Sequence, residues 1–203
     1  LIRIKENGLA LIRYQFKMET LLLNSSEKIN EIISIFDYYG VDINLKNLLH
    51  VEDISKKTTG ILITDEFEIS FLKPIFDYAS KNNIKILAVE RGLLSLINLI
   101  NGSSKEIERP FKGNSSTFIS LGSKLAEIIG GAGPLKTNFE YNFEIPIKAL
   151  PPNYLPSSIN LESGCIEAIE SEGKTNILGV LWPILSGQKI PSRFENILSW
   201  ISD

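Results

Sequence analysis

The chain has 203 residues, of which 43% are hydrophobic, and its 21 basic and 24 acidic residues give a net charge of −3. This length and composition can support a substantial core, so we expect a single domain over residues 1–203. The basic residues form no cluster of the size that a nucleic-acid backbone requires, and no apolar run reaches the roughly 20 residues that span a bilayer. We therefore expect neither nucleic acid nor a membrane as a partner.

The chain contains one cysteine and one histidine. Cys165 cannot form an internal disulfide, which fits a reducing compartment, and we expect a cytoplasmic protein. Because Cys165 follows Gly164 at the start of a strand-like segment, we interpret it as a small buried hydrophobic side chain. His50 has acidic neighbours but no serine or cysteine elbow accompanies it, so we interpret it as a structural histidine.

Short β-rich runs alternate with stretches of helical periodicity along the chain, which favours an α/β fold. The strand-like runs are 8–16, 20–23, 41–45, 60–64, 84–89 and 117–121, and the helical ones are 29–36, 72–79, 93–100 and 125–129. Glycines follow the first helix at Gly40 and the last of these at Gly130, where a left-handed residue commonly ends a helix.

Residues 135–182 change in character and become strand-like with Pro, Asn and Gly interruptions. A hairpin is predicted in which 166–169 and 176–182 flank a turn at 171–174. The last helix is predicted from the capping-box spacing of Ser192 and Glu195 after Pro191. Its apolar face should dock on the sheet, and the residues that share this face are Phe194, Ile197, Leu198 and Ile201.

The stretch KILAVERGLLSL, residues 85–96, has the layout of a nucleophile elbow. A short apolar strand leads into a corner at Glu90 and Arg91, then into Gly92 and an apolar helix. Hydrolases of several kinds hold a nucleophile at such a corner, and that residue is usually Ser or Cys. Here the corner holds a glutamate, so the stretch is either an active site with a replaced residue or buried scaffold.

Three stretches in order carry a resemblance to a known family: GILITDE with the following FLKPIFDYASKNNIKILAVERGLLSLINLINGS, then SKLAEIIG, then SGCIEAIES with NILGVLWPILSG. They resemble the class I glutamine amidotransferase superfamily, and within it the γ-glutamyl hydrolase-like branch (peptidase C26 type). The match runs from Gly60 to Gly187 with a weak middle. The resemblance implies a three-layer, flavodoxin-like fold with a mostly parallel central sheet and helices on both faces.

The same resemblance places the catalytic positions of the family on residues that cannot perform the chemistry. The nucleophilic cysteine falls on Glu90, the base histidine on Pro183 and its orienting carboxylate on Leu185, while Trp182 is kept. A cysteine nucleophile needs a base, and the base needs an orienting group. All three are replaced here, so no catalytic residue is expected to be competent.

The oxyanion position of the family is replaced as well. Its glycine pair falls on Thr64, Asp65 and Glu66, where carboxylates would repel developing negative charge. The candidate pocket then consists of residues around the old elbow, namely Asp65, Glu66, Glu90, Arg91 and Trp182.

We interpret Glu90 as a residue that satisfies the helix start and pairs with a basic side chain such as Arg91. Together with Asp65 and Glu66 it gives three carboxylates that could hold Mg²⁺ or Ca²⁺, but such a rim is more often solvated, so we expect no metal and no cofactor.

The resemblance therefore implies an amidotransferase-like protein that has lost glutaminase and γ-glutamyl hydrolase activity and is not an enzyme. It would be retained to bind a small molecule or a protein, and a homo-oligomer is one form that the latter could take. The alternative is an active hydrolase of C–N (amide or γ-glutamyl) bonds with altered chemistry, in which Glu90 is base or nucleophile and Asp65 or Glu66 assists.

Overall fold

The computed structural model describes residues 5–6, 9–10, 18–24, 28–102, 104–111, 115–137, 139–173, 175–187 and 190–202. A nine-stranded sheet forms the centre of this part of the chain. In chain order its strands are β3 (Glu19–Leu23), β4 (Leu45–Asn47), β5 (Thr58–Ile63), β6 (Lys85–Val89), β8 (Ser115–Ile119), β9 (Gly133–Thr137), β11 (Tyr154–Asn160), β12 (Ile166–Ser171) and β13 (Ile177–Val180).

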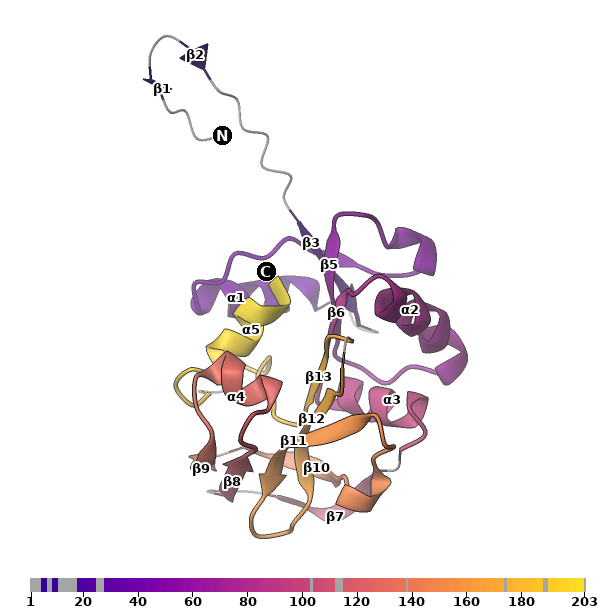
Figure 1. Cartoon of the computed structure of the whole chain (residues 1–203), viewed down its shortest axis with the longest axis vertical. Coiled ribbons are helices and arrows are strands. Elements are labelled where there is room, and N and C mark those ends of the chain that lie inside the picture. Colours follow the sequence, from indigo (N-terminus) through magenta and orange to yellow (C-terminus); the bar gives the residue numbers. More distant parts are fainter. Residues whose placement is uncertain are drawn as a thin grey trace.

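Helices cover both faces of the sheet. They are α1 (Ile29–Tyr38), α2 (Ile69–Lys81), α3 (Arg91–Leu99), α4 (Lys124–Ile129) and α5 (Glu195–Ser202), with 3₁₀ turns at η1 (Val51–Asp53) and η2 (Ile147–Ala149). Figure 1 shows the sheet nearly edge-on, with α1, α4 and α5 on one side and α2 and α3 on the other. The predicted three-layer α/β architecture is confirmed.

The strand order is β4-β3-β5-β6-β13-β12-β11-β8-β9. The first five strands pair in parallel, and the pairs from β13 to β9 are antiparallel. Strands β11 and β9 run in the same direction as the five parallel strands. Seven of the nine strands therefore share one direction, and the sheet is mostly parallel. Numbered by their own sequence order, the five parallel strands follow the 2-1-3-4-5 order of flavodoxin-like folds.

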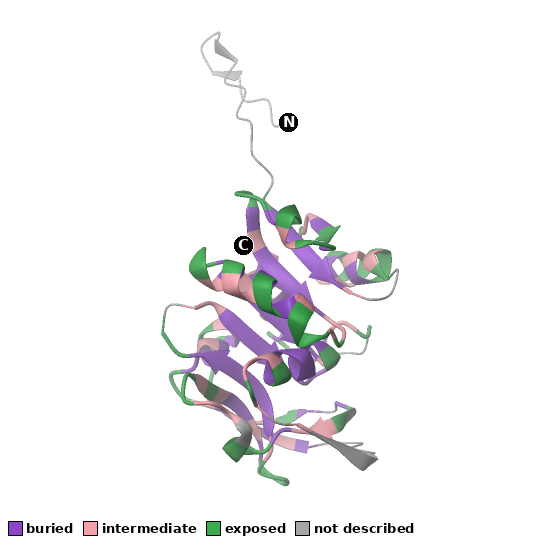
Figure 2. Ribbon diagram, turned by 90° about the vertical axis from the view of Figure 1, so that its right-hand side faces the viewer, coloured by how far each residue is buried: buried purple, intermediate pink, exposed green. Residues whose placement is uncertain are grey.

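The parallel strands are short apolar runs because both of their faces are covered. Residues 21–23, 61–63 and 86–89 are all buried, and Figure 2 shows the central strands as the most buried part of the molecule. Such continuous runs, without polar alternation, are typical of parallel strands between two helical layers.

The C-terminal helix docks on the sheet as predicted. Its apolar residues Ile197, Leu198 and Ile201 are fully buried, and α5 contacts β3, β5, β6 and α4. The capping-box prediction is wrong, because the helix begins at Glu195 and Ser192 lies in the turn before it. Arg193 in that turn has a φ of 78° and donates from Nη1 to the Gly130 carbonyl at 3.1 Å, so the turn contacts the end of α4.

Several other boundaries differ from the sequence expectation. The strand predicted over 41–45 begins only at Leu45, because the Val41 amide still donates to the Phe36 carbonyl (2.9 Å) as part of the end of α1. Cys165 is half-buried rather than buried, since it lies in the turn before β12. The predicted hairpin is confirmed as the antiparallel pair β12 and β13. Apart from β2 (Leu9–Ala10), the strand predicted over 8–16 lies outside the described residues.

Two small sheets accompany the main one. Strand β1 (Lys5–Glu6) pairs with β2, and β7 (Lys105–Phe111) pairs antiparallel with β10 (Tyr141–Glu144). No pattern in the sequence indicates the second pair. It matters for the site described below, because the chain around β10 borders the carboxyl end of the parallel strands.

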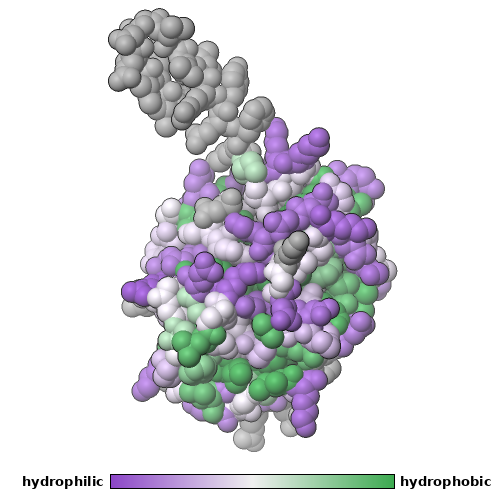
Figure 3. Space-filling model, in the orientation of Figure 1, coloured by the Kyte–Doolittle hydropathy of each residue, from purple (hydrophilic) through white to green (hydrophobic). Residues whose placement is uncertain are grey.

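Large hydrophobic side chains are exposed in both halves of the described chain. On the face drawn in Figure 3, hydrophobic side chains are more frequent over the lower, antiparallel part of the molecule. Large hydrophobic side chains exposed in the antiparallel half are Leu121, Ile147, Leu155 and Leu161. No helix in the described part of the chain is long and apolar enough to cross a membrane.

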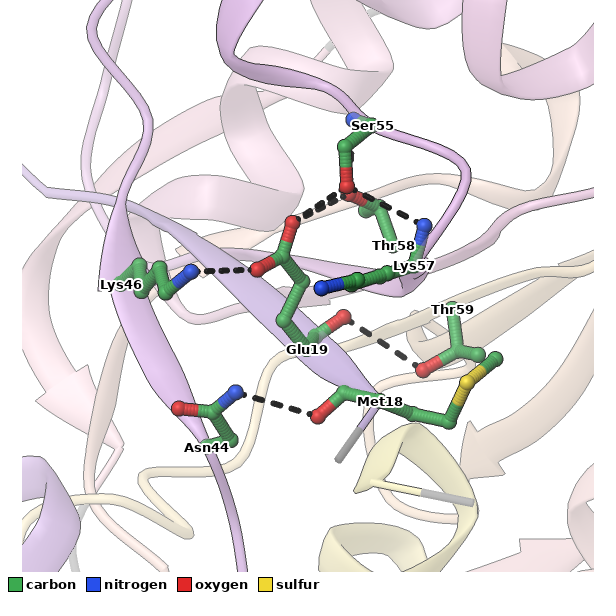
Figure 4. Close-up of polar contacts among 8 residues, drawn as sticks. All are labelled: Met18, Glu19, Asn44, Lys46, Ser55, Lys57, Thr58 and Thr59. Atoms are coloured by element: carbon green, nitrogen blue, oxygen red, sulfur yellow. Dashed lines mark hydrogen bonds and ion pairs between the residues drawn. The ribbon is translucent and has the colours of Figure 1, made fainter. Parts of the chain in front are cut away.

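At the amino end of β3, the Glu19 carboxylate is held in a polar cluster (Figure 4). Its Oε2 accepts from Lys46 Nζ at 2.5 Å, and its Oε1 accepts from the Ser55 hydroxyl at 2.6 Å and the Thr58 hydroxyl at 3.2 Å. The hydrogen bond from Lys46, followed by that from Ser55, lowers the pKa of Glu19 below its usual value despite burial. This cluster joins the starts of β3 and β5 to β4.

Candidate ligand-binding cleft

The corner between β6 and α3 has the strained backbone of a nucleophile elbow. Glu90 lies there with φ 51° and ψ −113°, a conformation that residues other than glycine rarely adopt. Its amide donates to the Val180 carbonyl at 2.9 Å, and its carbonyl accepts from the Leu93 amide at 3.0 Å. The corner is thus tied both to the end of β13 and to the first turn of α3.

Gly92 allows the helix after the corner to approach β5. A Cβ built at this position would lie 2.0 Å from the Ile63 carbonyl oxygen, so no side chain fits there. Gly179 of β13 has a similar role, since its Cβ would lie 2.5 Å from Leu93 Cδ1. These two glycines, both part of the motifs in the sequence, let α3 lie directly against the sheet.

Ser95 fixes the loop after β5 beside the corner. Its buried hydroxyl accepts from the Phe67 amide at 2.7 Å and donates to the Asp65 carbonyl at 3.3 Å. The loop carrying Asp65 and Glu66 is therefore held against α3. Asp65 lies close enough to Glu90 for its negative charge to act on that carboxyl group.

Two clefts open at the carboxyl end of the parallel strands, and Glu90 lines both. The larger has a volume of about 700 Å³ and the smaller about 270 Å³. Glu90, Arg91 and Ser186 belong to both linings. The clefts therefore meet at the elbow, at the sheet edge where open α/β folds bind their ligands.

The larger cleft lies between α1, the loop after β5 and the loop after β13. Its other charged linings are Lys28, Glu31 and Asp65, and its apolar ones are Ile32, Ile35 and Leu185. The smaller cleft lies toward β10. Beside the shared residues it is lined by Glu140, Asn142, Phe143, Leu181 and Pro183.

Glu90 is half-buried, and its carboxylate forms no hydrogen bond or ion pair with another described residue. Burial raises the pKa of Glu90 above its usual value, the positive charges of Arg91 and Lys28 lower it, and the negative charge of Asp65 raises it. No described residue forms a direct hydrogen bond or ion pair with the Glu90 carboxylate that would compensate for its desolvation. This carboxyl group can therefore accept a proton or a cationic ligand group more readily than a solvated one.

Arg91 pairs with a different carboxylate from the one predicted. Its Nη1 lies 3.8 Å from Glu66 Oε1, and both side chains are exposed. Its guanidinium also lies 6.0 Å from the centre of the Phe143 ring. The predicted pairing of Glu90 with Arg91 is not formed, and Glu90 does not cap α3 with its side chain.

The structure brings together most, but not all, of the residues singled out in the sequence. Asp65, Glu90, Arg91 and Leu185 line the larger cleft and Pro183 lines the smaller. Glu66 does not line either cleft, and it contacts the site through its ion pair with Arg91.

Trp182 lies outside the clefts and is fully buried. Its ring stacks on Phe139, with ring centres 5.7 Å apart, and packs at a tilt against Phe194, with ring centres 4.8 Å apart. Its role in the described structure is packing between β13 and the C-terminal segment. It is not a lining residue of either cleft.

Sequence reasoning missed the charged residues of α1 and those near β10. Lys28 and Glu31 follow the carboxyl end of β3. Because ligands of open α/β folds bind at the carboxyl ends of parallel strands, this position could have indicated that both residues lie at the site. Glu140, Asn142 and Phe143 come from a segment without a recognisable motif, and only the fold brings them to the elbow.

No group of three or more His, Cys, Asp or Glu side chains within the described ranges has the arrangement to hold a metal ion. His50 is exposed beside η1, where its amide donates to Asp53 Oδ2 at 2.8 Å, and neither His50 nor Cys165 lines either cleft.

Comparison with solved structures identifies the fold. A GMP synthase subunit protein from Thermoplasma acidophilum superposes with a TM-score of 0.67 at 12% identity, covering 91% of this chain and 92% of that one. The glutaminase domain of Trypanosoma brucei CTPS with bound acivicin gives 0.64 at 14% identity, covering 91% of each chain. A glutamine amidotransferase from Thermotoga maritima gives 0.61 at 13% identity, covering 91% and 81%.

No protein-family model matches the chain, and no curated protein matches it in sequence. At identities of 12–14%, the structural likenesses establish the fold alone. The chain has the fold of class I glutamine amidotransferase domains.

Proposed function

We propose that this chain is a class I glutamine amidotransferase superfamily protein, of the γ-glutamyl hydrolase-like branch, that does not hydrolyse amides and binds a small molecule in the clefts around Glu90. The observation that carries the proposal is the elbow itself. Its strained backbone is kept at Glu90, but the side chain there is a carboxylate rather than a thiol or hydroxyl.

The described residues around Glu90 include no histidine that could serve as the base of a thiol or hydroxyl nucleophile. Pro183 and Leu185, which the resemblance aligns with the base and its orienting carboxylate, lie on the smaller and larger cleft beside Glu90. Neither has a side chain that can take or hold a proton. The described linings of both clefts contain no histidine and no cysteine.

Stabilisation of an oxyanion is also disfavoured. The Thr64 amide at the end of β5 donates to the Leu23 carbonyl at 3.1 Å, so it is engaged within the sheet. The next residue, Asp65, places a negative charge near Glu90. A tetrahedral intermediate at the elbow would develop its negative charge next to two carboxylates.

Ligand binding is the role that the remaining features support. A strained residue of this kind costs about 1–3 kcal/mol and persists when the surrounding structure imposes it, most often at functional sites. The larger cleft, with about 700 Å³, has the size of sites for small organic molecules, which is about 300–1,000 Å³. Both clefts combine apolar walls with a few charged groups.

Hydrolysis assays test the proposal. Ammonia release from glutamine and amine release from a γ-glutamyl amide should stay at the buffer rate for the wild-type chain and for Glu90→Ala. Release by the wild-type chain that disappears in Glu90→Ala would overturn it and favour the altered hydrolase. Release that persists in both proteins would also overturn it, because hydrolysis would then proceed from another residue.

A further inference from the structure

We propose that the two joined clefts bind an elongated aliphatic amine, of the α,ω-diamine type, with one ammonium group on the Glu90 carboxylate. This inference rests on the proposed function, since it assigns the elbow to recognition rather than catalysis. Three observations carry it: the missing partner of Glu90, the charges of the lining, and the way the clefts meet.

Glu90 requires a donor that the described structure does not provide. Its carboxylate is half-buried at the junction of the clefts and has no hydrogen-bond or ion-pair partner among the described residues. A buried acceptor without a partner is costly, and a charged donor is the most effective compensation. A primary ammonium group offers three donors in a compact volume, which suits a half-buried carboxylate that lines both clefts.

The described linings favour a cation over an anion. Four carboxylates face the clefts, namely Glu31, Asp65, Glu90 and Glu140, against the two basic residues Lys28 and Arg91. Arg91 forms an exposed ion pair with Glu66, and Asp65 and Glu140 have interaction partners of their own, so the comparison rests on the number of charges of each sign. An anionic ligand would therefore meet more repulsion than attraction at the elbow, whereas a dication would be attracted in both clefts.

The shape of the site favours a long ligand over an ion. Volumes of about 700 and 270 Å³ exceed what a single ion fills, and no group of metal-ligating side chains was found in the described part of the chain. The clefts share Glu90, Arg91 and Ser186, so a chain anchored at Glu90 can extend into either.

Apolar surface is available for the methylene groups of such a ligand. Ile32, Ile35 and Leu185 line the larger cleft, and Leu181 and Pro183 line the smaller. Burial of a methylene group favours binding, so affinity should rise by up to about fourfold per methylene until the second ammonium reaches a carboxylate.

Phe143 adds an aromatic face to the smaller cleft. An ammonium group near such a ring is attracted by its quadrupole. The guanidinium of Arg91 already lies 6.0 Å from the ring centre, so the ring accepts a cation on one side in the described structure.

Isothermal titration calorimetry with defined probes tests the inference. The probes are a series from propane-1,3-diamine to hexane-1,6-diamine, n-butylamine as a monoamine, and glutarate as a dianion of similar length. Salt near 0.15 M screens attraction that depends only on the net charge of the protein. We expect saturable binding of a diamine, weaker binding of n-butylamine and no binding of glutarate.

Two variants locate the ammonium group. Glu90→Gln removes the charge and keeps the size, and we expect it to weaken diamine binding by at least about tenfold. Glu172→Gln is the matched control, because Glu172 is an exposed glutamate in the β12–β13 turn, at the opposite end of the parallel strands. We expect its affinity to stay within about twofold of the wild-type value.

Each outcome decides a different point. No saturable binding of any diamine, equal weakening by both variants, or tighter binding of glutarate would overturn the amine inference while leaving a non-hydrolytic protein in place. Amide hydrolysis that depends on Glu90 would overturn the proposed function itself. Because Glu90→Gln relieves a desolvated charge, it is expected to fold, and a thermal-shift measurement with and without diamine provides a second readout.

Discussion

Two glutamates at opposite ends of the parallel strands contrast in every respect that matters for function. Glu19, at the amino end of β3, accepts hydrogen bonds from Lys46, Ser55 and Thr58, and its pKa is lowered. Glu90, after the carboxyl end of β6, has no partner among the described residues, and burial raises its pKa. The Glu19 carboxylate stabilises the folded state, whereas the desolvated Glu90 carboxylate destabilises it.

The difference lies in how the chain surrounds each side chain. Glu19 lies in extended backbone, and its neighbours on β4 and before β5 converge on it (Figure 4). Glu90 lies in strained backbone at a corner that opens into two clefts. A folded chain generally satisfies its buried charges internally, and the exception at Glu90 is the basis of the binding role that we propose for it.

The largest expected effect concerns the glycine that holds the elbow in place. Gly92→Ala should lower the free energy of unfolding by more than about 3 kcal/mol, because its Cβ would lie 2.0 Å from the Ile63 carbonyl oxygen. Urea denaturation measures this loss. Gly131→Ala is the control, since nothing lies within 4 Å of its Cβ, and it should change stability little. Equal stabilities of the two variants would contradict the close contact of α3 with β5.

Removing the charge at the satisfied site should have the next largest effect. Glu19→Gln should destabilise the chain by about 2 kcal/mol at neutral pH, because its amide oxygen can still accept from the Ser55 and Thr58 hydroxyls but its amide NH2 group replaces the charged acceptor of Lys46. The folded-state pKa lies below the ordinary value of 4.5, so the stability from this carboxylate is present above 4.5 and is lost as pH falls through the folded-state pKa. Urea midpoints of both proteins across this range measure the effect. A constant difference at all pH values would contradict it.

Removing the charge at the elbow should act in the opposite direction. Glu90→Gln should stabilise the chain by about 1 kcal/mol at neutral pH, since a desolvated carboxylate becomes a neutral amide. Here the folded-state pKa lies above 4.5, so the folded state binds more protons and wild-type stability falls as pH rises from 4.5 through that pKa. The advantage of the variant should therefore disappear below pH 4.5. A destabilised variant at neutral pH would indicate a partner for Glu90 and break the contrast with Glu19.

The smallest expected effect is on catalysis. Glu90→Cys restores the thiol but neither a base nor its orienting group, because Pro183 and Leu185 remain beside the elbow. Ammonia release from glutamine should stay at the buffer rate. A measurable rate, with the protein shown to be folded by circular dichroism, would mean that another residue near the clefts serves as the base.

The sequence predicts the parallel half of the fold well because its signals are local. Apolar runs mark β3, β5 and β6, and glycine endings mark α1 and α4. The pairing of β7 with β10 depends on contacts between distant segments, so no local pattern indicates it. The turn before α5 likewise contacts a distant segment, since Arg193 donates to the Gly130 carbonyl, and the capping-box pattern carries no information on such a contact.

The candidate site is predictable in part. The strand, corner and helix identify Glu90, and the loop after β5 identifies Asp65. The motif assigns Trp182 to the pocket, yet its ring lies in an aromatic cluster in the core. The motif gives the position of a residue in the chain but not the direction of its side chain. Glu140 and Phe143 reach the smaller cleft only through the tertiary fold.

A carboxyl titration by ¹³C NMR tests the central contrast most directly. The side-chain resonances of Glu19 and Glu90 can be assigned by their disappearance in the two Gln variants and followed in one sample. We expect Glu19 to titrate below 4.5 and Glu90 above it. A Glu90 resonance that titrates at or below 4.5 would contradict it, because the carboxylate would then have a stabilising partner and no need of a ligand.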